Sequence, residues 1–338
     1  AVAKAVCDQI GKLTHVSNLY YVEHRDELAR DIVLLFGAPA RVFFSNSGAE
    51  AVEGAIKLAR KWGTAARGPK CHNIVTAQRS FHGRTLAALA ATGQPSKQEA
   101  FAPLPAGFSH VPLNDLAALA DAVDETTCAV LLEPVQGEGG VYPCDLGYLQ
   151  AVRTLCDERG VLLILDEVQT GLMRTGSPFA WQVYGVSPDI MCLAKSLANG
   201  LPIGAVVAIP EVADAFAPGD HGSTFGGGPV VCAAGRATLA ALQSERLGEN
   251  AVASGEYLRA RLRSFATETG QVADVRGAGL MNALEFTEPI AADVATRALA
   301  RGLVLNAIGA HILRILPPLV CGRSEIDTLV AELYESVA

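Results

Sequence analysis

The sequence has no long hydrophobic run and little positive charge. Its most apolar stretch, residues 161–165, is followed at once by Asp166 and Glu167, so it is far shorter than the ~20 apolar residues of a membrane-spanning helix. Lys and Arg together number 27 against 35 Asp and Glu, which gives a formal net charge of −8. No basic field is therefore present to hold a nucleic-acid backbone or an anionic membrane, and we expect neither as a partner.

Cysteine is present, but not at the spacings of metal or redox motifs. The eight cysteines are scattered along 338 residues, with no Cys-x-x-Cys pair and no cluster with histidine, so no metal site is predicted. Scattered cysteines in a long chain are typical of reducing compartments, and we expect reduced thiols and a cytoplasmic protein. The chain begins at Ala1, without methionine, inside an amphipathic pattern, which predicts a further segment upstream.

Short apolar runs alternate with helical patterns over the first part of the chain. Hydrophobic residues make up 50% of the sequence, which is enough for a large core. The runs predict strands at residues 41–44, 73–76, 129–132, 161–165, 190–193 and 205–209. Their alternation with helices predicts an α/β fold with a mainly parallel sheet covered by helices on both faces.

The C-terminal part of the chain has a different pattern. A helix rich in Ala and Leu is predicted at residues 229–244, then helices at 251–269 and 290–301 and strands at 280–286 and 312–316. This mixture indicates a smaller α+β domain. We therefore expect a large domain over residues 1–243 and a small domain over residues 244–338.

Lys195 is the only lysine in the second half of the chain. Every other lysine lies at or before Lys97, whereas 13 arginines follow that position. Lys195 comes directly after a predicted strand, between Ala194 and Leu197, where desolvation would lower the pKa of its amine and make it a nucleophile. Taken alone, the simpler interpretation is a surface lysine that ends a strand.

Asp166 stands at the carboxyl end of a predicted buried strand, the edge at which parallel sheets bind ligands. A carboxylate in this place can hold a proton on a heterocyclic nitrogen and so turn a pyridine ring into an electron sink. A strand-ending turn or a helix cap is the alternative explanation for Asp166 and Glu167.

Two further motifs follow predicted strands. Ser45-Asn-Ser-Gly-Ala-Glu50 leads into a helical pattern, so its hydroxyls and N–H groups could hold a phosphate or simply cap the helix. Phe81-His-Gly-Arg84 offers a ring that could stack on a heterocycle and a guanidinium for a carboxylate, although a core Phe beside an exposed Arg is the simpler interpretation. Together, Lys195, Asp166, the possible phosphate-binding motif at residues 45–50 and the pair Phe81 and Arg84 are the parts needed to bind pyridoxal 5′-phosphate.

The sequence resembles the class III pyridoxal-phosphate aminotransferases, and among them most closely the acetylornithine aminotransferases, along essentially its whole length. The motifs that carry this resemblance are Thr14–Tyr20, Phe43–Glu50, Phe81–Thr85, Thr92–Pro95, Glu133–Glu138, Leu165–Gly171, Ala194–Lys195, Pro202–Gly204 and His221–Gly227. The resemblance implies the PLP-dependent transferase fold type I, with a mainly parallel seven-stranded sheet.

The resemblance also implies a role for each matching residue. Lys195 and Asp166 would be catalytic: Lys195 would bind the cofactor covalently and move a proton between substrate and cofactor, and Asp166 would pair with the pyridine nitrogen. The implied cofactor-binding set is Gly48, Ala49, Phe81, Asp166, Glu167, Val168, Gln169, Lys195 and Thr224. In this set Gly48 and Ala49 bind the phosphate, Phe81 stacks on the ring and Gln169 lies near the phenolic oxygen. Thr224 would reach the phosphate of the cofactor in the other subunit, so that a homodimer shares its two active sites.

The substrate-binding residues implied in the same way are Arg84, Ser223, Glu138 and Arg314. Arg84 would hold the α-carboxylate of the substrate, and Ser223 would contact the substrate of the other subunit. Glu138 would mask Arg314 until 2-oxoglutarate requires it. The expected reaction moves the δ-amino group of N2-acetyl-L-ornithine to 2-oxoglutarate, giving N-acetyl-L-glutamate 5-semialdehyde and L-glutamate in arginine biosynthesis.

Other activities stay open at this point. Related ω-aminotransferases act on succinylornithine, ornithine, 4-aminobutyrate or a carrier-linked aminoadipate semialdehyde, and Arg84 suits any substrate with an α-carboxylate. An aminomutase would keep the same cofactor residues, and a non-catalytic dimer of this fold is a further alternative, against which Lys195 and Asp166 argue. The chain departs from the family pattern at Ala49, where many relatives have threonine, at Gly228, where asparagine is common, and at Asn282, where glycine is usual. We expect modest effects from these departures.

Overall fold

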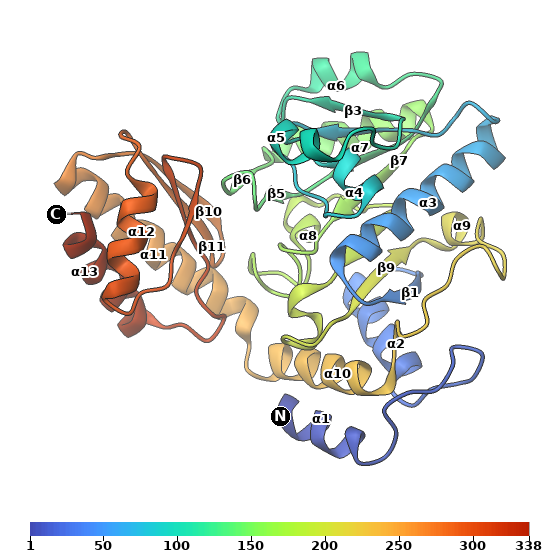
Figure 1. The fold of residues 1–338 in the computed structure, drawn as a ribbon, viewed down its shortest axis with the longest axis horizontal. Helices are drawn as coiled ribbons and strands as arrows, with labels where there is room; N and C mark the ends of the chain where they lie inside the picture. Colours follow the sequence, from blue (N-terminus) through green and yellow to red (C-terminus); the bar gives the residue numbers. More distant parts are fainter. Residues whose placement is uncertain (338) are drawn as a thin grey trace.

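The fold was analysed in a computed structural model that describes residues 1–337, and its main feature is a seven-stranded sheet (Figure 1). The strand order is β1-β9-β8-β7-β4-β2-β3. Neighbouring strands from β3 to β8 run parallel, and only β9 is antiparallel to its neighbours β8 and β1. The predicted mainly parallel seven-stranded sheet is therefore confirmed. The strands are β1 (Arg41–Ser45), β2 (Asn73–Ala77), β3 (Phe108–Val111), β4 (Thr127–Leu132), β7 (Leu162–Asp166), β8 (Ile190–Leu193) and β9 (Gly204–Ala208).

Helices cover both faces of this sheet, as the pattern predicts. On one face, Ala51, Ala55 and Leu58 of α3 pack with Ile74 and Ile164 of the strands. On the other face, one cluster joins strand residues to α6 and α7, and a second joins them to α2 and α10. The helices of this part are α1 (Val2–Ile10), α2 (Arg25–Phe36), α3 (Gly48–Arg67), α4 (Leu86–Ala91), α5 (Pro95–Gln98), α6 (Leu116–Ala122), α7 (Leu146–Arg159), α8 (Ala180–Tyr184), α9 (Pro210–Ala213) and α10 (Pro229–Ser244), with 3-10 turns η1 (Glu99–Phe101) and η2 (Lys195–Ala198).

Burial on both faces explains why the inner strands are apolar runs rather than alternating patterns. Every residue of β4, β7 and β8 is buried. The predicted strand at 161–165 lies one residue later, at Leu162–Asp166, and the one at 205–209 lies one residue earlier, at Gly204–Ala208. The pattern missed β3, an edge strand whose Ser109 and His110 interrupt the apolar signal.

A second, smaller sheet lies in the C-terminal part, beyond α10 (Figure 1, left). Its strand order is β10-β11-β13-β12, and all pairs are antiparallel. The elements are α11 (Leu247–Thr269), β10 (Val272–Ala278), β11 (Met281–Phe286), α12 (Ala291–Ala300), β12 (Asn306–Ile308), β13 (Ile312–Ile315) and α13 (Arg323–Val337). Leu258, Leu284, Leu313 and Leu333 share one apolar core, in agreement with the α+β pattern. The proposed domain division at 243/244 falls in the last turn of α10 and stays a proposal.

A short two-stranded ribbon, β5 (Val135–Gln136) with β6 (Tyr142–Pro143), projects between the two sheets. The small sheet touches it, since β10 packs against β6. Within residues 1–337, no helix combines the length and the apolarity needed to span a membrane.

Candidate active site

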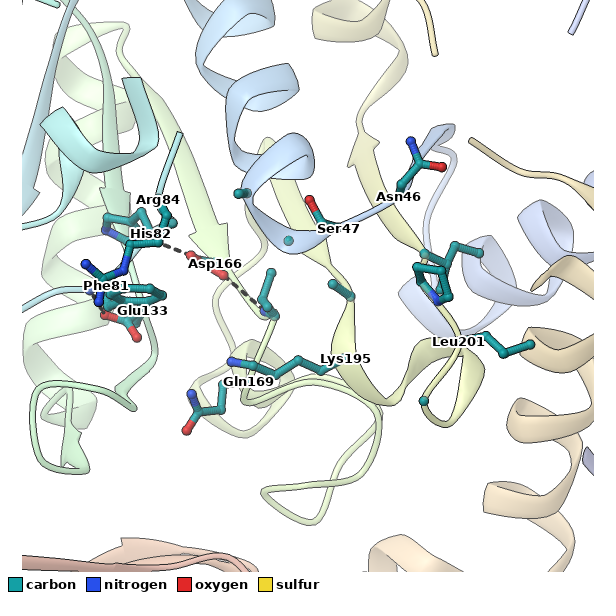
Figure 2. Close-up of a pocket in the computed structure, with 18 residues that line it drawn as sticks. Asn46, Ser47, Phe81, His82, Arg84, Glu133, Asp166, Gln169, Lys195 and Leu201 are labelled. Atoms are coloured by element: carbon teal, nitrogen blue, oxygen red, sulfur yellow. Dashed lines mark hydrogen bonds and ion pairs between the residues drawn. The ribbon is translucent and has the colours of Figure 1, made fainter. Parts of the chain in front are cut away.

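A cavity of about 470 Å³ opens at the carboxyl ends of the parallel strands (Figure 2). Most of the predicted site residues line it: Gly48, Ala49, Phe81, Arg84, Asp166, Val168, Gln169 and Lys195. The further lining residues are Asn46, Ser47, His82, Gly83, Glu133, Ala194 and Gly200–Ile203. Segments that follow five different strands (β1, β2, β4, β7 and β8) thus meet where open α/β sheets bind their ligands.

Lys195 begins η2, directly after β8. Its φ is +43°, a left-handed conformation that costs an L-residue about 1 to 2 kcal/mol. The Lys195 side chain is exposed to the open cavity, while the protein atoms around its amine partly desolvate it. This desolvation lowers the pKa of the Lys195 amine, and Asp166 and Glu133 oppose that shift by favouring the charged form. A lysine with a lowered pKa is a better nucleophile and proton carrier.

Asp166 is the last residue of β7 and is 5% exposed. Its Oδ2 lies 2.8 Å from Nδ1 of the buried His82, and its Oδ1 accepts a 3.1 Å hydrogen bond from the Val168 N–H (Figure 2). Since a carboxylate only accepts, Nδ1 of His82 carries the proton. The aspartate is therefore oriented from two sides, with one carboxylate edge left for the cavity.

The residues predicted to bind a phosphate lie at the start of α3. Ser47 caps the helix, because its Oγ accepts a 3.2 Å hydrogen bond from the Glu50 N–H. The N–H groups of Gly48 and Ala49 have no acceptor within the helix, and they lie at its positive end. A Cβ at Gly48 would lie 2.9 Å from Cγ1 of Val168, so only glycine leaves this wall of the cavity open.

Phe81 and Arg84 lie on one side of the cavity. The guanidinium of Arg84 is 5.6 Å from the centre of the Phe81 ring. Arg84 is exposed, and it forms no ion pair with any residue in the part of the chain that the structure describes. It is therefore available to a carboxylate of a ligand.

Glu133 is a buried carboxyl group that the sequence reasoning missed, although it begins a recognised motif. Its Oε2 accepts a 3.0 Å hydrogen bond from the Phe81 N–H, and its Oε1 accepts one of 3.1 Å from the Gly137 N–H. Burial raises the pKa of Glu133 to about 7, helped by the nearby Asp166 and opposed by His82. His82 was missed in the same way, since its signal was only its place between Phe81 and Arg84.

Glu138 and Arg314 are in contact, as the resemblance implies. Nη1 of Arg314 lies 2.6 Å from Oε1 of Glu138, and also donates a 3.3 Å hydrogen bond to Oε1 of Gln169. The Arg314 side chain is 11% exposed, and its Nε has no partner among residues 1–337. Because Gln169 lines the cavity and Arg314 comes from the small sheet, the pair stands at the junction of the two sheets.

Besides Glu138 and Arg314, three more of the predicted residues do not line this cavity. The Glu167 carboxylate faces α8, where it accepts from the Trp181 N–H at 2.9 Å and from the Thr170 hydroxyl. Its burial raises its pKa to about 7. Ser223 lies in a separate hollow of about 220 Å³, 3.1 Å from Nδ2 of Asn46, and Thr224 is exposed. Their positions agree with the idea that they serve a neighbouring subunit, which stays a prediction.

These residues fit pyridoxal 5′-phosphate. The free amides at the start of α3 suit its phosphate, the buried edge of Asp166 suits a protonated ring nitrogen, and Lys195 supplies an amine with a lowered pKa. The missing Cβ of Gly48 leaves room between the helix start and Val168.

Known proteins resemble this chain over nearly its whole length. An acetylornithine aminotransferase from Methanothermobacter thermautotrophicus is 50% identical over 97% of this chain and 82% of its own length. One from Caldanaerobacter subterraneus subsp. tengcongensis is 48% identical over 97% of this chain and 83% of its own. The solved structure of the ornithine aminotransferase from Toxoplasma gondii ME49 superimposes with a TM-score of 0.94 at 34% identity, covering 99% of this chain and 81% of that one.

The sequence model of the class-III aminotransferases matches residues 1–337. With the strand-end lysine and aspartate, the free amides at the start of α3 and the two arginines in place, the chain belongs to the class-III aminotransferase family.

Proposed function

We propose that the protein transfers the δ-amino group of N2-acetyl-L-ornithine to 2-oxoglutarate and that it uses pyridoxal 5′-phosphate. The observation that carries this proposal is the unequal state of the two arginines. Arg84 is exposed and unpaired at the cavity, whereas Arg314 is masked by Glu138 at 2.6 Å. A δ-amino donor needs one arginine for its α-carboxylate, and 2-oxoglutarate needs two, one for each carboxylate. The names of the relatives support acetylornithine as the amino donor.

When bound, the cofactor supplies a conjugated ring that accepts the electron pair released as the C–H bond of the amino-bearing carbon breaks. Asp166 keeps a proton on the ring nitrogen, and His82 holds the aspartate in position. The Lys195 amine would take the proton from the substrate carbon and deliver it to the cofactor, a task that suits an amine with a lowered pKa. Arg84 fixes the α-carboxylate, so that the δ-carbon lies at the ring.

The partner substrate uses the second arginine. When 2-oxoglutarate enters, Glu138 leaves Arg314, whose guanidinium then binds a carboxylate. The unpartnered Nε of Arg314 supports this step, because a buried N–H without an acceptor gains a hydrogen bond when a carboxylate arrives. One cavity thereby accepts two substrates of different charge.

We also propose a cytoplasmic homodimer. The exposed Thr224 and the separate position of Ser223 support shared sites, and the free state of all eight cysteines supports a reducing compartment. Light scattering of the purified protein gives the mass of the assembly, and cell fractionation gives the compartment. A monomer that turns over at full rate would contradict the shared sites.

Turnover with defined substrates tests the proposal. Glutamate formation from 2-oxoglutarate is measured with N2-acetylornithine, N2-succinylornithine, ornithine and 4-aminobutyrate as donors, and Lys195→Ala is the control. We expect the highest kcat/KM with N2-acetylornithine and no turnover in the control. A higher value with another donor reassigns the substrate, and product without an oxo acid indicates an aminomutase.

A further inference from the structure

The segment Gly137–Gly140, which carries Glu138, is held at both ends by side chains from different sheets. At its start, the Gly137 N–H donates to Glu133 at 3.1 Å. At its end, the Gly140 carbonyl accepts two hydrogen bonds from Arg276, at 3.0 Å from Nε and 2.8 Å from Nη2. Glu133 belongs to the loop after β4, whereas Arg276 lies on β10 of the small sheet.

Between these anchors the backbone packs closely against its surroundings. A Cβ at Gly137 would lie 2.4 Å from the Gln169 side chain, and one at Gly139 would lie 2.5 Å from the Arg79 carbonyl oxygen. Gly140, at φ +120°, would meet Cδ1 of Ile312 at 2.7 Å. The three glycines therefore let the backbone pack closely against both sheets, and the segment presents a single side chain, that of Glu138.

Arg276 is itself fixed in place. Its Nη1 lies 2.6 Å from Glu285 and 2.9 Å from Asp274, its guanidinium lies 3.9 Å from the centre of the Tyr142 ring, and its side chain is 9% exposed. The Tyr142 hydroxyl donates to the same Glu285 at 3.2 Å. Two carboxylates and one aromatic ring surround the guanidinium of Arg276. Its remaining N–H groups therefore point toward the Gly140 carbonyl.

The register of the small sheet relates Arg276 to Arg314. Arg276 pairs with Ala283 of β11, and Ala283 pairs with Arg314 of β13. Residues in register across antiparallel strands point to the same face, so the two arginines stand in one row, about 10 Å apart at two strand spacings. One holds the Gly140 carbonyl and the other the Glu138 carboxylate.

We propose that Arg276 is a positioning residue, which docks the segment Gly137–Gly140 on the small sheet so that Glu138 lies against Arg314. The inference rests on the proposed function, in which this contact masks the second arginine. Because the backbone is held at both ends, unmasking consists of a rotation of the Glu138 side chain, and the segment itself stays in place.

The test compares Arg276→Met with Arg276→Lys. Arg261→Met is the matched control, because Arg261 also forms an ion pair in the C-terminal part of the chain, with Asp327 at 2.6 Å, but lies away from the cavity. In Arg276→Met we expect kcat/KM for N2-acetylornithine to fall roughly tenfold, the worth of one charge-assisted hydrogen bond. The 2-oxoglutarate half-reaction should change by less than about threefold, because Glu138 has left Arg314 in that step. Arg276→Lys keeps one donor and should give an intermediate value.

Two further measurements separate positioning from general stability. In a Glu138→Gln background, Arg276→Met should have little further effect on the donor half-reaction, because the residue acts through Glu138. In the cofactor-free protein, amides of residues 137–142 should exchange hydrogen faster in Arg276→Met than in Arg261→Met. If both half-reactions fall equally, or if exchange at 137–142 is unchanged, the inference is overturned. The hydrogen-exchange measurement tests the role of Arg276 even if N2-acetylornithine is not a substrate. The proposed function and the proposed role of Arg276 can therefore fail separately.

Discussion

Two regions of the site are built in different ways. We call them the floor of the cavity, formed by Asp166, His82, Gly48 and Lys195, and the junction of the two sheets, formed by Glu138 and Arg314. At the floor, Asp166, His82, Gly48 and Lys195 all belong to the large sheet or to the segments that follow its strands, and Asp166 and His82 are buried. At the junction, Glu138 and Arg314 are 176 residues apart in sequence and come from different sheets. The floor holds the groups that do the chemistry, and the junction holds those that select the substrate.

This difference follows from what each task requires. Proton transfer needs groups that stay in hydrogen-bonding reach at every step, and a buried sheet edge provides that. Accepting two substrates needs a contact that can open and close, which two packed parts with an ion pair between them can supply. Substitutions at the floor should therefore affect both half-reactions, and substitutions at the junction only one.

The largest expected effect is at the floor. Lys195→Met should reduce turnover at least roughly a thousandfold in both half-reactions, because no other amine from residues 1–337 lines the cavity. Stopped-flow absorbance of each half-reaction measures this, with Lys97→Met as the control. Residual activity above a few per cent in one half-reaction would mean that the floor does not serve both.

The next effect concerns the buried carboxyl group of Glu167, which faces α8. Burial raises the pKa of Glu167 to about 7, well above its ordinary value of 4.5. A carboxyl that binds its proton more tightly in the folded state stabilises the fold below pH about 4.5, and this contribution is lost as the pH rises to about 7. The loss is on the order of 3 kcal/mol.

Glu167→Gln should therefore show a shallower decline in the free energy of unfolding between pH 4.5 and 7 than the wild type does. Denaturant unfolding at several pH values measures it. The control is Glu158→Gln, which removes an exposed carboxyl at the end of α7. Parallel pH profiles for the wild type and Glu167→Gln would show that Glu167 is ionised in the folded protein throughout this range.

At the junction the effect should be smaller and one-sided. Arg314→Met should raise KM for 2-oxoglutarate roughly ten- to thirtyfold, because one bidentate carboxylate contact is lost, and it should change the donor half-reaction little. Steady-state kinetics with each substrate varied in turn measure this, with Arg301→Met as a control in the same part of the chain. An unchanged KM and rate for 2-oxoglutarate would contradict a role for Arg314 in binding it.

The same contrast explains what could be predicted from the sequence. The strands of the large sheet are continuous apolar runs, and Asp166 and Lys195 come directly after two of them, so neighbours in sequence decide where these side chains stand. The Ser45–Glu50 motif is local in the same sense, since Ser47 caps a helix that begins at the next residue.

The junction carries no local signal. Arg276 lies on β10, whose Asp274, Arg276 and Gly277 interrupt any apolar pattern, and its target Gly140 is 136 residues away. The contact between Glu138 and Arg314 was reached through the resemblance to a family, and nothing in the spacing of the two residues indicates it. Glu133 and His82 were missed for a related reason, because their partners Phe81 and Asp166 become neighbours only when the loops after β2 and β4 and the end of β7 meet.

The smallest expected effect separates two roles of the start of α3, namely stabilising the helix and binding the phosphate. Ser47→Ala removes the cap of α3 and should lower the free energy of unfolding by about 1 kcal/mol. Asp115→Ala is a matched control, because Asp115 caps α6 through a 2.9 Å hydrogen bond from the Ala118 N–H, away from the cavity. Both variants should lose similar stability, but only Ser47→Ala should weaken the binding of pyridoxal phosphate, by a few-fold, since fraying at this end disturbs the amides of Gly48 and Ala49. Equal cofactor affinity in the two variants would mean that the start of α3 holds the fold together and contributes nothing to the phosphate site.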